Sequence, residues 1–343
     1  MRVMRGNWRL AGGSRFLGCS RRSSSSAKSS STNESDQRLR AFRGIVQERH
    51  SARRFEPNVA VPDHVWLDIL RMTSTSPSGF NLQPWNAILL RDPEIRGRVA
   101  KHSMLGKSLE HANMGRIHLH FAMLSVQGFG NQYRAVDASA ILVFCSDLEP
   151  SKRVDRIYDL ERQAGMREDG YMAVLRVASS FLTGESSTAS LHSSGGGSST
   201  HLSTMLKKTF TDVLSPVQPM PTMENVESWS YKNVGIAAQM YTLAATAHGL
   251  STCMMEGYDA RRLKEILRIP DRYGAPLVVA TGYEYDAPPV VHELVEEQDE
   301  VEEISKRRRT PRLDLSDVFF GDTFGEPLDI LLKDRDLVED TAA

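Results

Sequence analysis

The stretch Ser76-Pro77-Ser78-Gly79-Phe80-Asn81-Leu82-Gln83-Pro84-Trp85 lies between a helical pattern and the apolar run at residues 87–90. Its two prolines fix φ, and its glycine permits backbone conformations that other residues avoid. The serine, asparagine and glutamine side chains offer hydrogen-bonding groups where a strand is expected to begin. Because the same residue types make ordinary turns, the stretch by itself predicts either a binding loop or a simple chain reversal.

Around this stretch the chain alternates helical and strand patterns, which predicts an α/β (α+β) protein. Short aliphatic runs predict strands at residues 87–90, 140–145 and 277–281. Long helical patterns separate these runs, so we expect helices to cover the sheet.

Helical spacing predicts a first helix over residues 36–50 and a second one from Pro62, a residue suited to a first helical turn. The clearest helical pattern starts at Glu224 or Ser228 and stops at Gly249. Its small residues favour a helix that is packed on both sides, in the core or at a dimer interface.

The N-terminal residues 1–34 differ in composition from the rest of the chain. Scattered arginines and a serine-rich tract occur there, and residues 1–33 contain no Asp or Glu. Such a composition is typical of an organellar transit peptide, and arginines spaced along apolar residues favour the mitochondrion over the plastid. The alternative is a disordered, solvated tail that carries no targeting signal.

We expect one domain at residues 35–315, followed by a C-terminal extension at residues 316–343. A Ser/Gly-rich insertion at residues 184–204 interrupts the domain and is flexible by composition. This insertion lacks the Lys-Ser/Thr ending of a GxxxxGK pattern, so it does not predict a phosphate-binding P-loop.

The composition excludes several classes of protein. A net charge of −1 over 343 residues argues against a nucleic-acid binder, and no apolar run approaches the ~20 residues of a membrane-spanning helix. Cys19, Cys145 and Cys253 stand far apart and predict neither a disulfide framework nor a zinc site. His118 and His120 lack further ligands at metal spacing, and no nucleophilic triad is evident.

A second polar constellation, Arg49-His50-Ser51-Ala52-Arg53, follows the first expected helix. Two neighbouring arginines and a serine hydroxyl suit an anion such as phosphate. The alternative is that they are surface arginines beside a helix cap and bind no ligand. Farther on, an acidic run at residues 293–303 precedes Lys306-Arg307-Arg308-Arg309. This basic cluster predicts either a nuclear-import signal or a second group of arginines that contact the phosphate.

Taken together, these segments resemble the FMN-dependent nitroreductase family. Five stretches match it in order: Arg49 to Phe55, Ser76 to Trp85, Asn131 to Phe144, His248 to Tyr258, and Pro276 to Tyr283. The resemblance implies a central mixed β-sheet flanked by helices, in an intertwined homodimer that holds FMN at the subunit interface. The matched stretches are spread in order across most of the span from Phe42 to Arg309.

The resemblance also implies a set of cofactor-binding residues: Arg49, His50, Ser51, Arg53, Pro77, Ser78, Asn81, Gln83, Asn131, Arg134, Glu256, Gly257, Arg307 and Arg309. Arg49 and Ser51 are expected to hold the FMN phosphate together with Arg307 and Arg309. The choice of these two among four consecutive basic residues stays open.

For the flavin ring, the resemblance places Arg53 and Arg134 near N1 and O2, and Asn131 at the pyrimidine edge. The backbone amides of Glu256 and Gly257 are expected to face O4 and N5. The loop at residues 76–85 is expected to reach the flavin of the partner subunit.

The implied activity is ping-pong transfer of hydride from NAD(P)H through flavin N5 to a nitroaromatic or quinone-type acceptor, with no catalytic side chain and no metal. The sequence diverges most from the family at residues 151–228, where the substrate-covering helices are expected. Other readings therefore stay open: reductive dehalogenation or flavin fragmentation on the same scaffold, or a non-catalytic flavin-binding interaction protein.

Overall fold

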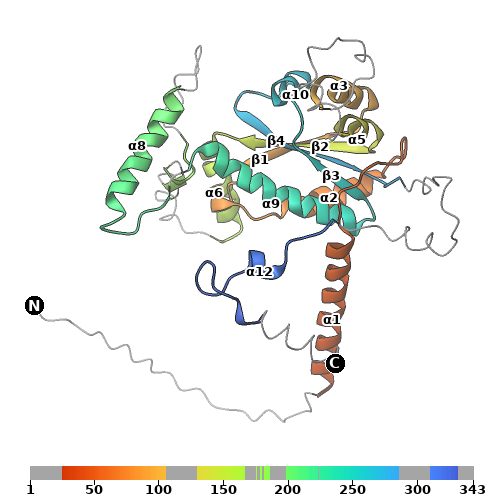
Figure 1. Ribbon diagram of the computed structural model, residues 1–343, viewed down its shortest axis with the longest axis horizontal. Coiled ribbons are helices and arrows are strands. Elements are labelled where there is room, and N and C mark those ends of the chain that lie inside the picture. Colours follow the sequence, from red (N-terminus) through yellow and green to blue (C-terminus); the bar gives the residue numbers. More distant parts are fainter. Residues whose placement is uncertain are drawn as a thin grey trace, which may run out of the picture. The chain divides into compact units, whose positions relative to one another are not determined.

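The computed structural model describes most of the chain in two units, residues 1–47 and 48–343 (Figure 1). The residues described are 25–105, 130–166, 175, 178–179, 181–185, 198–222, 224–285 and 310–330. Helix α1 (Ser25–Glu48), up to Gln47, makes up the described part of the first unit. The second unit contains the sheet and every other element.

Helix α1 begins at Ser25 instead of Asp36, inside the segment for which the sequence predicts a tail. No proline or glycine interrupts the chain from Ser25 to Arg43, and Glu34 forms an (i, i+4) ion pair with Arg38. Residues 1–24 lie outside the described part, so the transit peptide stays a prediction.

Four strands form one sheet in the order β1-β2-β4-β3, and each neighbouring pair is antiparallel. The strands are β1 (Trp85–Leu90), β2 (Ala140–Asp147), β3 (Ser251–Met255) and β4 (Tyr273–Gly282). Strands β1, β2 and β4 contain the three runs that the sequence predicts. Strand β3 is an addition, because the sequence indicates only a turn there.

Parallel pairing, which the expected mixed sheet requires, occurs among the described residues only as a single bridge. This bridge joins Ser51 to Thr252 of β3, and the Ala52 amide donates to the Thr252 carbonyl at 2.9 Å. The segment that contains Ser51 therefore runs beside β3 at the edge of the sheet. Buried Ala52 and Phe55 anchor it in the core.

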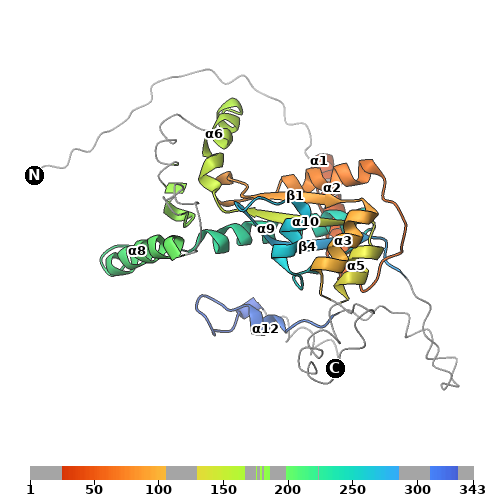
Figure 2. The same cartoon turned by 90° about the horizontal axis from the view of Figure 1, so that it is seen from above.

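Helices cover both faces of the sheet (Figures 1 and 2). On one face α9 (Val226–Ala247) packs against the strands and against α2 (Asp63–Ser74). On the other face lie α3 (Pro93–Ser103), α5 (Asn131–Asp137) and α10 (Ala260–Leu267). Alternate residues of the fully buried β2 serve the two cores, as a strand that is covered on both sides requires.

Apart from the earlier start of α1, the boundaries of the predicted helices shift only slightly. Pro62 caps α2 instead of starting its first turn, and Asn225 caps α9 by accepting from the Ser228 amide at 2.7 Å. Gly249, with a φ of 72°, follows the end of α9 in the left-handed conformation expected of a glycine stop.

The remaining elements are η1 (Gly79–Asn81), η4 (Pro150–Arg153), α6 (Val154–Gln163), α8 (Ser198–Leu214) and α12 (Leu315–Val318). Helix α8 starts inside the insertion predicted to be flexible, so residues 198–204 are helical there. No helix in the described part of the chain is long and apolar enough to cross a membrane. The described residues also contain no cluster of metal-ligating side chains.

Candidate functional site

A cavity of about 340 Å³ lies where three segments meet at the β3 edge of the sheet. Its lining residues are Ser51, Asn131, Arg134, Cys253, Met254, Met255, Glu256 and Gly257. Ser51 comes from the bridged segment, two residues come from α5, and the others come from β3 and its exit. The fold thus brings together five of the residues implied by the family resemblance: Ser51, Asn131, Arg134, Glu256 and Gly257.

The segment before Ser51 is fixed by its histidine. The His50 Nε2 atom lies 2.7 Å from a carboxylate oxygen of Glu284, and Nδ1 lies 2.8 Å from the Glu48 carbonyl oxygen. His50 therefore contacts the protein and does not line the cavity. Arg49 and Arg53 do not line it either, and neither forms an ion pair with a described carboxylate.

Helix α5 supplies the main hydrogen-bonding groups of the cavity. Asn131, only 5% exposed, donates through Nδ2 to the Gly257 carbonyl at 3.1 Å and accepts through Oδ1 from Arg134 Nη1 at 3.2 Å. The Arg134 Nε atom is buried without a hydrogen-bond partner. A cation held at a cavity with an unused donor suits a ligand that offers acceptors or negative charge.

The exit of β3 forms the other wall. The Gly257 carbonyl accepts from the Leu105 amide at 3.0 Å as well as from α5, and this pins the chain in place. Among the described residues, no acceptor is bonded to the amides of Glu256 and Gly257. Met254 and Met255 add apolar surface. The cavity therefore combines several donors with apolar surface, as a planar ligand rich in acceptors requires.

The Cys253 thiol also lines the cavity, a position that the sequence does not indicate. Burial raises the pKa of Cys253, and the nearby positive charge of Arg134 opposes this only in part. The thiol is therefore protonated near neutral pH and adds to the apolar surface of the cavity.

The loop at residues 76–85 lies apart from the cavity, and none of Pro77, Ser78, Asn81 and Gln83 lines it. The loop has a strained backbone: Phe80, Asn81 and Gln83 have φ values of 54°, 54° and 46°. The Ser78 hydroxyl accepts from the Gln83 amide at 2.9 Å, which closes the loop on itself.

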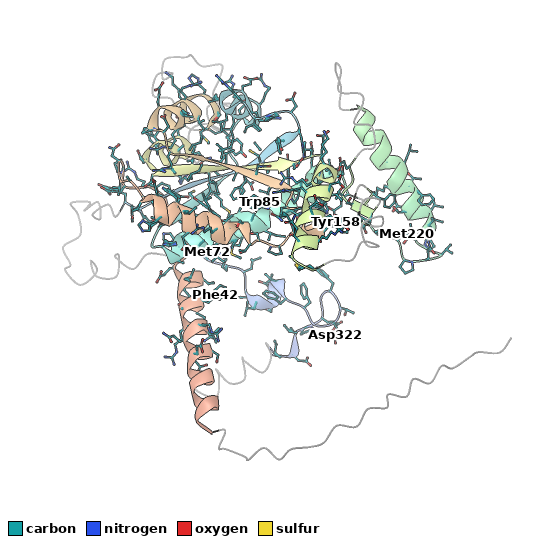
Figure 3. All side chains as sticks on the ribbon, turned by 180° about the vertical axis from the view of Figure 1, so that it is seen from behind. Phe42, Met72, Trp85, Tyr158, Met220 and Asp322 are labelled. Atoms are coloured by element: carbon teal, nitrogen blue, oxygen red, sulfur yellow. The ribbon has the colours of Figure 1, made fainter. Side chains whose placement is uncertain are left out.

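Contacts with two helices hold this conformation. Asn81 donates to Glu161 of α6 at 3.0 Å, and the Gly79 amide donates to Asn233 of α9 at 3.0 Å. Phe80 packs with Tyr158 and Trp229 around buried Leu82. Figure 3 labels Tyr158 on α6 and Trp85, which ends the loop. A glycine is required at position 79, because a Cβ there would lie 2.7 Å from the Trp229 ring.

A buried charge cluster fixes the end of the loop. Fully buried Asp147 accepts from Arg153 Nε at 2.6 Å and from Arg272 Nη2 at 2.7 Å. Arg153 also donates to the Gln83 carbonyl at 2.6 Å. Burial alone would raise the pKa of Asp147, but hydrogen bonds from both arginines and from the Glu149 amide lower it below its ordinary value.

The sequence-based reasoning missed this cluster and the three β3 residues of the cavity. An aspartate two residues after the run at 140–145, with Arg153 six positions later, was the available signal for the cluster. Arg307 and Arg309 lie outside the described residues, so their contact with phosphate stays a prediction.

An antiparallel sheet covered on both faces, with a cavity at one edge that contains an unused arginine donor, defines an α+β protein with a pocket suited to a ligand that offers acceptors. The sequence comparison identifies it further: the Nitroreductase family model matches residues 46–183 and 218–283, more than half of the chain. The protein belongs to the nitroreductase family.

Among curated relatives, the chain is 22% identical over 237 residues to an oxygen-insensitive NADPH nitroreductase of Helicobacter pylori, and the match covers 69% of this chain and 83% of that one. A NADH dehydrogenase of Thermus thermophilus matches with the same identity and coverage. A shorter match, 31% identical over 68 residues, links it to human iodotyrosine deiodinase 1 and covers 20% of this chain and 23% of that enzyme.

Solved structures share the fold. The Bacillus subtilis nitroreductase YdfN superposes with a TM-score of 0.52 at 18% identity, covering 82% of this chain and 98% of its own. A nitroreductase from Exiguobacterium sibiricum, solved in complex with FMN, gives a TM-score of 0.51 at 17% identity, covering 81% of this chain and 95% of its own.

Proposed function

We propose that this protein is an FMN-dependent oxidoreductase that uses NAD(P)H to reduce nitroaromatic or quinone-type acceptors. The observation that carries the proposal is the buried, unpartnered Nε of Arg134, in a cavity that Ser51 and the chain at Glu256 and Gly257 also line. FMN presents the matching groups: a phosphate, a pyrimidine edge rich in acceptors, and an apolar ring system. Family membership supports the same cofactor.

In the proposed complex, the Ser51 hydroxyl and the Arg49 guanidinium bind the phosphate, with Arg307 and Arg309 as further contacts. Arg134 and Arg53 stabilise negative charge on the pyrimidine side of the ring, where Asn131 donates or accepts a hydrogen bond. When bound, FMN accepts electrons from the nicotinamide and passes them to the acceptor. The protein's own residues bind and orient the cofactor and tune its charge.

We also propose that the working unit is a homodimer. Within one chain, the loop at residues 76–85 lies apart from the cavity although the family resemblance assigns both to one flavin site. A second copy can resolve this, because a two-fold axis can bring the loop of one protomer to the cavity of the other. Ile236, 44% exposed on α9, offers apolar surface for such an interface.

The test is a titration of the purified full-length protein with FMN, followed by anaerobic addition of NADH or NADPH. We expect stoichiometric binding and bleaching of the bound yellow flavin. Arg134→Met should bind FMN at least about tenfold more weakly, because one charge-assisted contact is lost. A wild-type protein that remains colourless and takes up no FMN would refute the proposal.

Reductive dehalogenation is a second candidate, favoured by the short match to iodotyrosine deiodinase 1. It uses the same proposed cofactor site and differs in the acceptor. The two are separated by mixing the anaerobically reduced protein with a nitroaromatic or with a halophenol. Rapid reoxidation by the nitroaromatic alone supports the first proposal, whereas halide release from the halophenol supports the second.

A further inference from the structure

Arg96 of α3 is a guanidinium inside the protein core, outside the cavity. It is only 7% exposed and forms no ion pair with a described carboxylate. Its burial lowers its pKa, while Asp92 and Asp137 act in the opposite direction from a distance. A buried charge must be compensated by nearby polar groups, so its hydrogen-bond partners show what it does.

Those partners are backbone carbonyls at the end of α5. Arg96 Nη1 donates to the Val136 carbonyl at 3.1 Å and to the Ala138 carbonyl. The last carbonyls of a helix have no partners within the helix, and the C-terminus carries partial negative charge. Arg96 therefore satisfies the end of α5 in both hydrogen bonding and charge.

Helix α5 needs such support because it spans only Asn131–Asp137. A helix this short is unstable by itself and depends on tertiary contacts. Side-chain contacts fix its beginning: Asn131 donates to Gly257, and Gln132 donates to the Met104 carbonyl at 3.1 Å. Arg96 fixes its end, one turn beyond Arg134.

We propose that Arg96 is a positioning residue for the cofactor site, acting through α5 to orient Asn131 and Arg134. This inference rests on the proposed FMN site. It assigns to α3 a role that neither the cavity lining nor the sequence motifs indicate. Arg96 does not line the cavity, so it would act on the cofactor through the helix that it holds.

The test compares Arg96→Met with Arg98→Met in the full-length protein. Arg98 is exposed on the same helix, so its substitution controls for the loss of one arginine. Two readouts are used: hydrogen–deuterium exchange of the α5 amides without cofactor, and the FMN dissociation constant. We expect Arg96→Met to accelerate exchange in α5 and to raise the dissociation constant at least about tenfold, and Arg98→Met to change neither by more than about twofold.

A double mutant then separates positioning from general destabilisation. In an Arg134→Met background, Arg96→Met should weaken FMN binding less than in wild type, because part of the contact through which it acts is gone. Arg96→Lys, which retains the charge but has a compact donor group, should give intermediate values. If Arg96→Met does not fold, Arg96→Lys serves for the same comparisons.

Unchanged FMN affinity in the Arg96 variants, or an equal loss in the Arg134→Met background, would overturn the inference while the FMN proposal stands. Absence of FMN binding by wild type would instead refute the proposed function, and this inference with it. Exchange in α5 does not require the cofactor, so it shows in either case whether Arg96 holds the helix.

Discussion

Replacement of Asp147 by asparagine is expected to lower the free energy of unfolding by about 3 kcal/mol. Asparagine preserves the shape of the side chain but removes the charge that Arg153 and Arg272 share. Removing one partner of a buried ion pair costs about 3–5 kcal/mol. We expect the lower end of this range, because the side chains of Arg153 and Arg272 keep 22% and 28% of their exposure and can turn toward water.

The measurement is urea-induced unfolding at pH 7 and at one fixed protein concentration, because the stability of the proposed dimer would depend on concentration. Asp271→Asn is the matched control: this carboxylate is exposed next to Arg272 and lies 3.8 Å from Lys264. It should change the free energy of unfolding by no more than about 0.5 kcal/mol. A change below about 1 kcal/mol for Asp147→Asn would show that the cluster contributes little.

Three further predictions concern stability. The folded protein holds the pKa of Asp147 below its ordinary value of 3.8, so the stability advantage of wild type over Asp147→Asn should be complete above that pH. The advantage should decline as pH falls through the lower pKa of the folded state, and a constant difference from pH 7 to pH 2 would contradict this. Gly79→Ala should lower the free energy of unfolding in urea by about 1–3 kcal/mol through its clash with the Trp229 ring, and Gly97→Ala, which meets open space on α3, should be neutral or stabilising in the same assay; equal effects of the two substitutions would contradict this. Tyr241→Phe should cost about 1–2 kcal/mol in urea, because it removes a fully buried 2.8 Å hydrogen bond to a β4 hydroxyl; an unchanged midpoint would contradict this.

The elements that the sequence predicts correctly are those whose own residues form a recognisable helix or strand pattern. Strands β1, β2 and β4 contain aliphatic runs, and α9 has regular small residues with a glycine stop. Strand β3, Ser251–Met255, has no such run, and its threonine is the one β-branched residue in it, so its sequence gives only a weak strand signal. Its conformation depends on pairing with β4, which a local pattern does not reveal.

The candidate site divides in the same way. Ser51, Asn131 and Arg134 stand in motifs, so the sequence indicates them, and the fold then brings them to one cavity. The Asp147–Arg272 pair is separated by 125 positions, and charged residues are mostly exposed, so the sequence by itself gives no reason to pair them. His50 stands in the motif of the predicted anion site, but its imidazole ring contacts the carboxylate of Glu284, just after β4, instead.

Strand β2 connects the two predicted halves of the flavin site. Helix α5, which carries Arg134, leads directly into it, and it ends at Asp147 in the cluster that holds Gln83. All of its residues are buried, so the strand is a rigid spacer between cavity and loop. In a symmetric dimer in which each loop reaches the partner's cavity, this spacing within one chain sets the separation of the two flavin sites.

This relation turns Asp147→Asn into a test of the dimeric site. Asp147 does not line the cavity, so the substitution changes no cavity-lining residue of its own chain. If the loop of one copy completes the cavity of the other, loosening the loop should raise the FMN dissociation constant as well as lower stability. Asp271→Asn should change neither. An Asp147→Asn protein that is less stable but binds FMN as wild type does would show that the loop has no part in the flavin site.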